Sequence, residues 1–167
     1  MREVIGIVVG GVIVAGGLLF LGVIVRFSIV APWHARGAAR RLRQPDIGGV
    51  VAVCGFAPPP ELVDLYRTAP FLERNEFQLV DARRTPPARW EIYGFYPLSR
   101  GDLREARTAH RVRDGIPIAS DGDKGCYVVL PGGAVVLRSP SVPGRERAVA
   151  ATAAELKSFD AVEPAVD

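Results

Sequence analysis

The sequence predicts an α+β domain, an antiparallel sheet with flanking helices, preceded by one transmembrane α-helix. One observation is an uncharged run from 4 to 25, built almost entirely from Val, Ile, Leu, Gly and Ala. Another is a strand-turn-strand pattern at 115–137, where three apolar runs are separated by two clusters of turn-forming residues. The order of helical and strand patterns after residue 46 indicates the α+β class.

The run from 4 to 25 predicts a membrane anchor over residues 1–30. As a helix it would extend about 33 Å, enough to cross the hydrocarbon core of a bilayer. A cleavable signal peptide would have a shorter apolar region and a small-residue cleavage site. One arginine precedes the run, and five follow it between residues 26 and 43. Because basic residues favour the cytoplasmic side, we expect a single-pass protein of the cell membrane with a cytoplasmic C-terminal domain.

Residues 31–45 read as a basic juxtamembrane linker. Trp33 stands where interfacial aromatic residues usually lie. The arginines can contact anionic headgroups at about 1 kcal/mol each. The expected membrane-interface residues are Arg26, Trp33, Arg36, Arg40, Arg41 and Arg43.

Three glycines of the anchor raise the question of self-association. Gly6, Gly10 and Gly17 fall on one helical face and would let two helices approach closely. Glycine is also common in membrane helices generally. A weak homodimer through these residues and a monomer therefore both stay open.

The domain is predicted over residues 46–160, with 161–167 as a tail. Pro60 suits the first turn of a helix that ends before Pro70. Ser99 and Thr152 each begin a capping-box pattern. The predicted helices are 47–56, 60–69, 100–110 and 151–159, and the predicted strands are 76–82, 89–96, 116–119, 126–130 and 134–137. Because the strand at 126–130 is apolar on both faces, we expect it to be covered on both sides.

The charge distribution argues against nucleic acid as a partner. The chain carries a net charge of +3, but from residue 45 onward it has 15 basic and 17 acidic side chains. The domain therefore lacks the basic field that attracts nucleic acid. Its two cysteines do not predict a disulfide scaffold.

No residue pattern predicts a catalytic or metal site. The segment Asp121–Gly125 is similar to the start of a calcium-binding loop. Such a loop needs a Glu at its twelfth position, which is Gly132 in this chain. Cys54 or Cys126 could act as a nucleophile with His110 as base, although lone cysteines are more often small buried hydrophobic residues. We expect no enzyme, no cofactor and no metal.

Recognition by the sheet face and its turns is the role that remains. The polar turn from Ser120 to Gly125 lies between strong strands, and loops on a rigid scaffold often carry recognition residues. In the aromatic strand at 89–96, alternate side chains face opposite sides, so one set can pack while the other anchors a partner. The candidate binding residues are Trp90, Tyr93, Asp121, Asp123 and Lys124.

Four segments occur in a characteristic order: Gly55 to Leu62, Trp90 to Leu98, Ile116 to Tyr127 and the closing helix Ala151 to Phe159. In that order they resemble the SUKH superfamily of Smi/Knr-type domains, and the resemblance covers about residues 46–160. The chain departs from the family pattern at Phe71 to Glu76, where an Asn-Gly turn is usual. The resemblance implies a non-enzymatic protein-binding domain, in bacteria often an immunity protein that neutralises a toxin by binding it.

Two functions stay open. The first is a membrane-tethered cytoplasmic binding module of the SUKH type, in which the unknown protein partner is a toxin. The alternative is a structural or regulatory scaffold protein of the cell envelope, with no toxin involved.

Overall fold

The computed structural model describes residues 39–139 and 146–164, which belong to one compact unit beginning at Ala39. The predicted anchor at 1–30 with its three glycines lies outside the described residues, as do Trp33, Arg36 and the end of the tail. Among the residues that are described, no helix combines the length and the apolar character needed to cross a membrane.

Helices come first in the unit and recur between the strands. The helical elements are α3 (Ile47–Cys54), α4 (Pro60–Thr68), the 3-10 helix η2 (Pro70–Glu73), α5 (Arg100–Ala109) and the 3-10 helix η3 (Ala153–Ser158). The strands are β1 (Phe77–Asp81), β2 (Ala88–Ile92), β3 (Gly94–Phe95), β4 (Ile116–Ser120), β5 (Cys126–Val129), β6 (Val135–Arg138), β7 (Glu146–Ala150) and β8 (Asp160–Val162).

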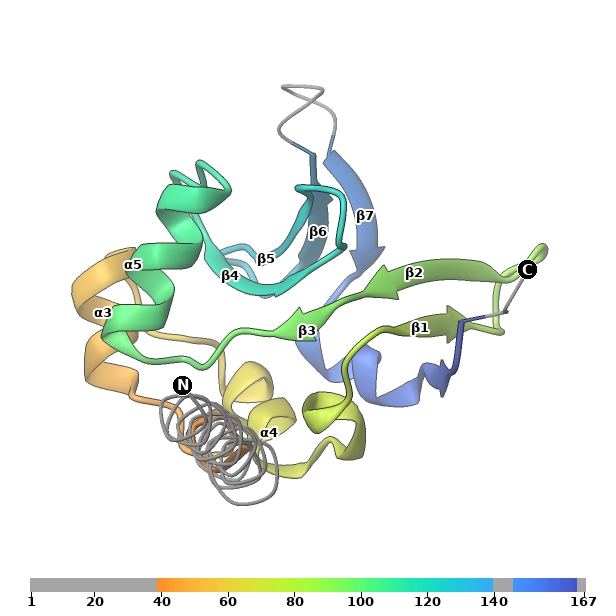
Figure 1. Ribbon diagram of the computed structural model, residues 1–167, viewed down its shortest axis with the longest axis horizontal. Helices are drawn as coiled ribbons and strands as arrows, with labels where there is room; N and C mark the ends of the chain where they lie inside the picture. The colour runs from red at the N-terminus through yellow and green to blue at the C-terminus, as the bar shows by residue number, and fades with distance from the viewer. Residues whose placement is uncertain (1–38, 140–145, 165–167) are drawn as a thin grey trace, which may run out of the picture. The chain divides into compact units, whose positions relative to one another are not determined.

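The strands form two antiparallel sheets, which confirms the predicted α+β class. One sheet has the order β2-β1-β8 and the other β3-β4-β5-β6-β7. Only Tyr93 separates β2 from β3, and its N–H donates to the Ser120 carbonyl at 2.9 Å. One nearly continuous ribbon therefore belongs to both sheets (Figure 1).

Most predicted elements form close to their expected bounds. Ser99 Oγ accepts the N–H of Asp102 at 3.3 Å, and α5 begins there as the capping pattern predicted. The closing segment differs, because η3 is a short 3-10 helix and Thr152 makes no side-chain cap. Glu155 instead accepts the N–H of Ala151 at 2.8 Å. The strands β7 and β8 were not predicted. Their apolar residues are few, Ala148 to Ala150 in β7 and Ala161 with Val162 in β8.

The core lies between the helices and the two sheets. Tyr66 of α4 is fully buried, and its hydroxyl donates to the Tyr96 carbonyl at 2.8 Å and lies 3.2 Å from that of Ile118. Burial raises the pKa of Tyr66, so the hydroxyl remains a neutral donor. This bond ties α4 to the strand pair β3 and β4.

Strand β5 is covered on both sides, as its sequence predicted. Tyr127 and Val129 belong to the main core, whereas Cys126 and Val128 pack in a second cluster with Val112 and Val136. All four residues of the strand are buried.

Part of the predicted linker packs on the domain. Leu42 is buried in the main core. Arg43 donates from Nε to Glu73 at 2.9 Å and from Nη1 to the Arg67 carbonyl at 3.3 Å. Residues 39–43 are therefore attached to α4 and η2, while Arg40 and Arg41 remain exposed.

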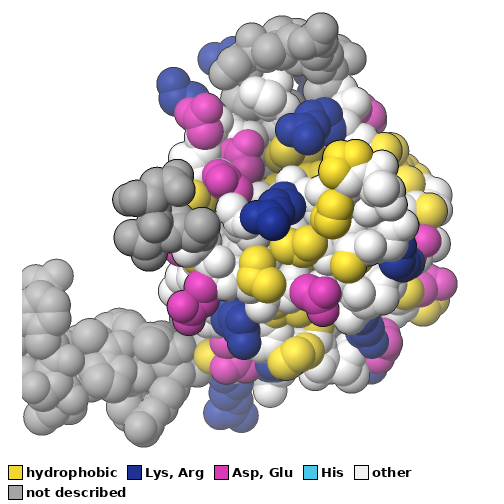
Figure 2. Space-filling model, turned by 90° about the vertical axis from the view of Figure 1, so that its right-hand side faces the viewer, with side chains coloured by type: hydrophobic (Ala, Val, Ile, Leu, Met, Phe, Trp, Pro, Cys, Tyr) yellow, Lys and Arg dark blue, Asp and Glu magenta, His cyan; other side chains and the backbone are white. Residues whose placement is uncertain are grey.

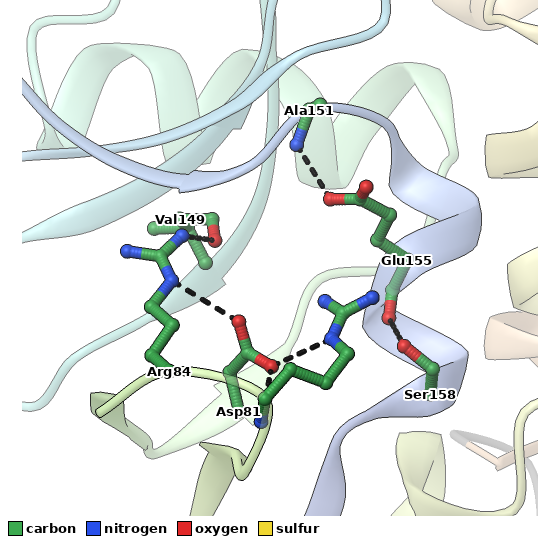
Figure 3. A network of polar contacts seen from close by, with 7 residues as sticks. Asp81, Arg84, Val149, Ala151, Glu155 and Ser158 are labelled. Carbon is green, nitrogen blue, oxygen red and sulfur yellow. Dashed lines mark hydrogen bonds and ion pairs between the residues drawn. The ribbon is translucent and has the colours of Figure 1, made fainter. Parts of the chain in front are cut away.

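Asp81, at the end of β1, is a charged side chain with only 3% of its surface exposed. One carboxylate oxygen accepts from Arg83 Nε at 2.7 Å and the other from Arg84 Nε at 3.1 Å. Arg84 also donates from Nη2 to the Val149 carbonyl of β7 at 3.2 Å (Figure 3). The hydrogen bond from Arg83 lowers the pKa of Asp81.

The same two arginines cover a pair of stacked aromatic rings. Arg84 lies 5.2 Å from the ring centroid of Trp90, and Arg83 lies 5.3 Å from that of Phe159. The two rings stack with centroids 5.3 Å apart and planes 9° apart. Charge, hydrogen bonds and cation–π attraction thus act together at this point.

We expect the fragment 39–167 to unfold cooperatively and to be more stable than the fragment 46–167. The shorter fragment loses Leu42 from the core, and emptying a buried leucine site costs about 2–5 kcal/mol. Denaturant unfolding followed by circular dichroism measures the difference. Equal stability of the two fragments would show that residues 39–45 do not belong to the folded unit.

We expect Asp81 to make stability depend on acid pH. Because the pKa of Asp81 is lower in the folded state, the carboxylate stabilises the fold above its unfolded pKa of about 3.9, and this contribution is lost as the pH falls through the lowered value. Asp81→Asn in the fragment 39–167 should melt lower than the parent at neutral pH, with a smaller further loss on acidification.

The exposed Asp160 provides the control for this measurement, since Asp160→Asn should leave the melting curve unchanged at neutral pH. If Asp81→Asn keeps both the parent's melting temperature and its full acid sensitivity, the carboxylate does not stabilise the fold.

Candidate functional site

A polar cleft of about 360 Å³ lies between β2 and the strands β5, β6 and β7. Its lining comes from five strands and one turn: Gln78, Arg89, Trp90, Glu91, Asp121, Asp123, Tyr127, Leu137 and Arg147. A site assembled from segments so far apart in the sequence depends on the tertiary fold.

Cross-strand pairing places the floor of the cleft on one sheet face. Tyr127 of β5 pairs with Leu137 of β6, which pairs in turn with Arg147 of β7, so the three side chains lie on the same side. Tyr127 donates its hydroxyl to the Glu91 carbonyl at 2.7 Å. This bond spans from β5 to β2 and fixes the distance between the two walls.

The wall formed by β2 follows the two-residue alternation of a strand. Trp90 and Ile92 face the core, whereas Arg89 and Glu91 are exposed. Gln78 of β1 is the cross-strand partner of Glu91 and extends the same polar face. The wall is therefore the solvent side of a half-buried sheet.

Charges of both signs line the cleft. Arg89 and Arg147 share it with Glu91, Asp121 and Asp123. Figure 2 shows the same mixture at the end of the domain that carries the β1–β2 hairpin, where basic, acidic and hydrophobic side chains are interspersed. The site therefore suits a partner surface that also carries both signs.

Tyr127 stays a neutral hydroxyl at the bottom of this charged site. Burial raises its pKa most strongly, and the negative charges of Asp121 and Glu91 raise it further. The neutral hydroxyl keeps its proton for the bond to the Glu91 carbonyl.

The turn after β4 is held by one of the predicted site residues. Asp121 Oδ1 accepts the N–H of Asp123 at 3.0 Å and that of Gly125 at 2.6 Å. Asp121 therefore shapes the turn, as aspartates commonly do, and Asp123 remains exposed at the rim. The carbonyl of Lys124 accepts from His110 Nδ1 at 3.0 Å.

Tyr93 is the exposed aromatic residue next to the cleft. Its side chain is 51% exposed, and its ring lies against Gly122, where any Cβ atom would overlap it. The ring lines an adjoining pocket of about 190 Å³ that shares Gln78 and Glu91 with the cleft. Tyr93 thus extends the polar cleft with an aromatic surface.

The structure brings together most of the binding residues expected from the sequence. Trp90, Asp121 and Asp123 line the cleft and Tyr93 lines the adjoining pocket, whereas Lys124 lines neither. Trp90 is only 4% exposed and stacks on Phe159, so its role is packing and not surface contact.

Several residues of the cleft were not predicted from the sequence. The strand alternation around Trp90 carried the signal for Arg89 and Glu91, because residues two apart share a face. Arg147 gave no such signal, since its strand opens with charged residues. Leu137 was expected only as part of an apolar strand.

Cys126 and His110, two of the three residues considered for nucleophilic chemistry, are engaged in other contacts. Burial raises the pKa of Cys126 to about 12, so the thiol is protonated at neutral pH. His110 Nε2 lies 2.7 Å from the Tyr96 hydroxyl and Nδ1 lies 3.0 Å from the Lys124 carbonyl, so both ring nitrogens have partners. Within residues 39–139 and 146–164, no group of three His, Cys, Asp or Glu is placed to hold a metal ion.

The structure is an α+β domain with a polar cleft built on antiparallel sheets. Comparisons with protein-family models, with curated proteins and with solved structures find no match to this chain.

Proposed function

We propose that the chain is a membrane-tethered, cytoplasmic protein-binding module that recognises its partner through the cleft between β2 and β5–β7. The observation that carries this proposal is the cleft itself, with charges of both signs beside an exposed tyrosine. The uncharged run at 4–25 and the arginines that follow it support the membrane tether and its orientation.

A protein partner suits the composition of this surface. Tyr and Arg are enriched at protein interfaces and among the residues that dominate binding energy. Tyr93 offers an aromatic anchor, and Arg89 and Arg147 offer planar donors for carboxylates or carbonyls.

The cleft is also largely preorganised. The Tyr127 hydroxyl and the Asp121 carboxylate hold its walls by hydrogen bonds within the domain. A partner would therefore bind with little cost for ordering the walls. Such a rigid surface favours recognition of one partner over adaptable binding of many.

The toxin-neutralising role is the specific form of the proposal and rests on the SUKH resemblance. Two of the resembling segments, 90–98 and 116–127, contribute Glu91, Asp121 and Tyr127 to the cleft. The envelope scaffold is the alternative. A toxin gene beside this one would favour the immunity role, whereas a cell-shape defect on deletion, without any competitor, would favour the scaffold.

We expect a photo-crosslinking residue at position 89 of the full chain to capture a protein in the cells that produce it. The same residue at position 61, exposed on α4, should not capture that protein.

Because Tyr93 is the proposed anchor, Tyr93→Ala should weaken binding of the captured partner by about 2 kcal/mol or more, roughly 30-fold. Asp123→Ala at the rim should cost less.

Glu61→Ala serves as the affinity control, and unchanged melting of every variant excludes unfolding as the cause. Full affinity retained by Tyr93→Ala, Arg147→Ala and Asp123→Ala together would assign binding to another surface.

A further inference from the structure

Helix α3 is apolar throughout, although one side of it faces solvent. Its sequence, Ile-Gly-Gly-Val-Val-Ala-Val-Cys, contains no polar side chain. A surface helix of a soluble domain normally carries polar residues on its outer face. Here Val50 is buried, while Ile47 and Val51 are 45% and 43% exposed.

The exposed apolar residues of α3 form a continuous strip. Ile47 and Val51 lie one helical turn apart, and the exposed Gly48 and Ala52 follow them in the same arrangement. We call Ile47, Gly48, Val51 and Ala52 the α3 strip. Elsewhere in the described residues, exposed large hydrophobic side chains occur singly, such as Val162 on β8.

Three exposed arginines lie next to α3 in the chain or on the helix that packs against its buried side. Arg40 and Arg41 are exposed shortly before α3 in the chain, and Arg100 is exposed at the start of α5. The two helices pack so closely that a Cβ atom on Gly49 would lie 3.0 Å from the backbone nitrogen of Arg100. Figure 1 shows α3 and α5 side by side at one end of the domain. The carboxylate of Asp46 is engaged in capping α3, where it accepts the Gly49 N–H at 2.8 Å.

We propose that the α3 strip docks on the surface of the bilayer, with the neighbouring arginines on anionic headgroups. The inference rests on the proposed membrane anchor. Only residues 26–38 join the uncharged run to Ala39, and even fully extended they reach at most about 45 Å. The tether therefore keeps the domain next to the bilayer at a high effective concentration, where a weak contact is sufficient.

The size of the strip fits a lipid surface better than a second protein. Ile47 and Val51 each retain about half of their side chain for burial, which favours docking roughly fivefold per residue. Each arginine near anionic lipid adds about fivefold. A stable protein interface buries about 800 Å² on each side, far more than two half-exposed side chains provide.

Docking through α3 would leave the recognition cleft accessible. The β1–β2 hairpin lies at the end of the domain opposite to α3 (Figure 1). The strip therefore orients the tethered domain so that β2 and the cleft point away from the bilayer.

The test uses the full chain in phosphatidylcholine vesicles with and without phosphatidylglycerol. An environment-sensitive fluorophore is attached at Ala52→Cys in a Cys54→Ser background, and in a second sample at Glu163→Cys, beside β8. We expect nitroxide lipids to quench the label at position 52 and not at 163, with stronger quenching when phosphatidylglycerol is present.

Val51→Glu and Val162→Glu are matched variants, because each places a carboxylate at an exposed valine. Val51→Glu should lower the ratio of docked to undocked protein by about tenfold or more, whereas Val162→Glu should leave it unchanged. Both variants should keep the parent melting temperature.

Carbonate extraction separates this inference from the proposed anchor. If the chain stays in the vesicles after extraction while the label at 52 remains unquenched, the docking inference fails and the anchor stands. If the chain is extracted, the anchor fails. Concentration-dependent energy transfer between labels at 52, without lipid quenching, would assign the strip to a second copy and overturn the inference.

Discussion

The buried carboxylate of Asp81 fixes the arrangement on which the rest of the domain depends. It ends β1, binds Arg83 and Arg84, and through Arg84 reaches the Val149 carbonyl of β7 in the other sheet. A buried charge is tolerated only when it is paired and hydrogen-bonded, so the carboxylate requires the two arginines, whose own side chains are about half exposed. The position of β7 relative to β1 and β2 follows, and β2 and β7 are walls of the cleft.

Arginine side chains also cover edge strands of both sheets. The Val149 carbonyl accepts from Arg84, and the Ala161 carbonyl of β8 accepts from Arg74 at 3.0 Å. Edge strands with unpaired carbonyls invite pairing with other chains, and charged side chains are a common means of preventing it. At one point of the structure, arginine side chains thus stack on aromatic rings, pair with a carboxylate and cover a strand edge.

The sequence predicted those parts of the fold that rest on local patterns. The helix from Arg100 was foreseen because Ser99 caps it, and the strand at Cys126 because its apolar residues require cover on both sides. The strands β7 and β8 were missed because their pairing partners, and not their own residues, make them strands. For the site, Tyr93 and Asp123 could be named as candidates, but the cleft needs the bond from Tyr127 to the Glu91 carbonyl. Nothing in the local sequence predicts a contact between residues so far apart.

The two proposals use surfaces at opposite ends of the domain. In them, the α3 strip contacts the bilayer and the cleft binds a protein partner. Hydrogen exchange of the full chain, with and without the partner captured at position 89, tests this division most directly. We expect slower exchange in residues 89–93, 121–127 and 146–147, with α4 unchanged. Slower exchange confined to α4 or α5, with the cleft strands unaffected, would contradict it.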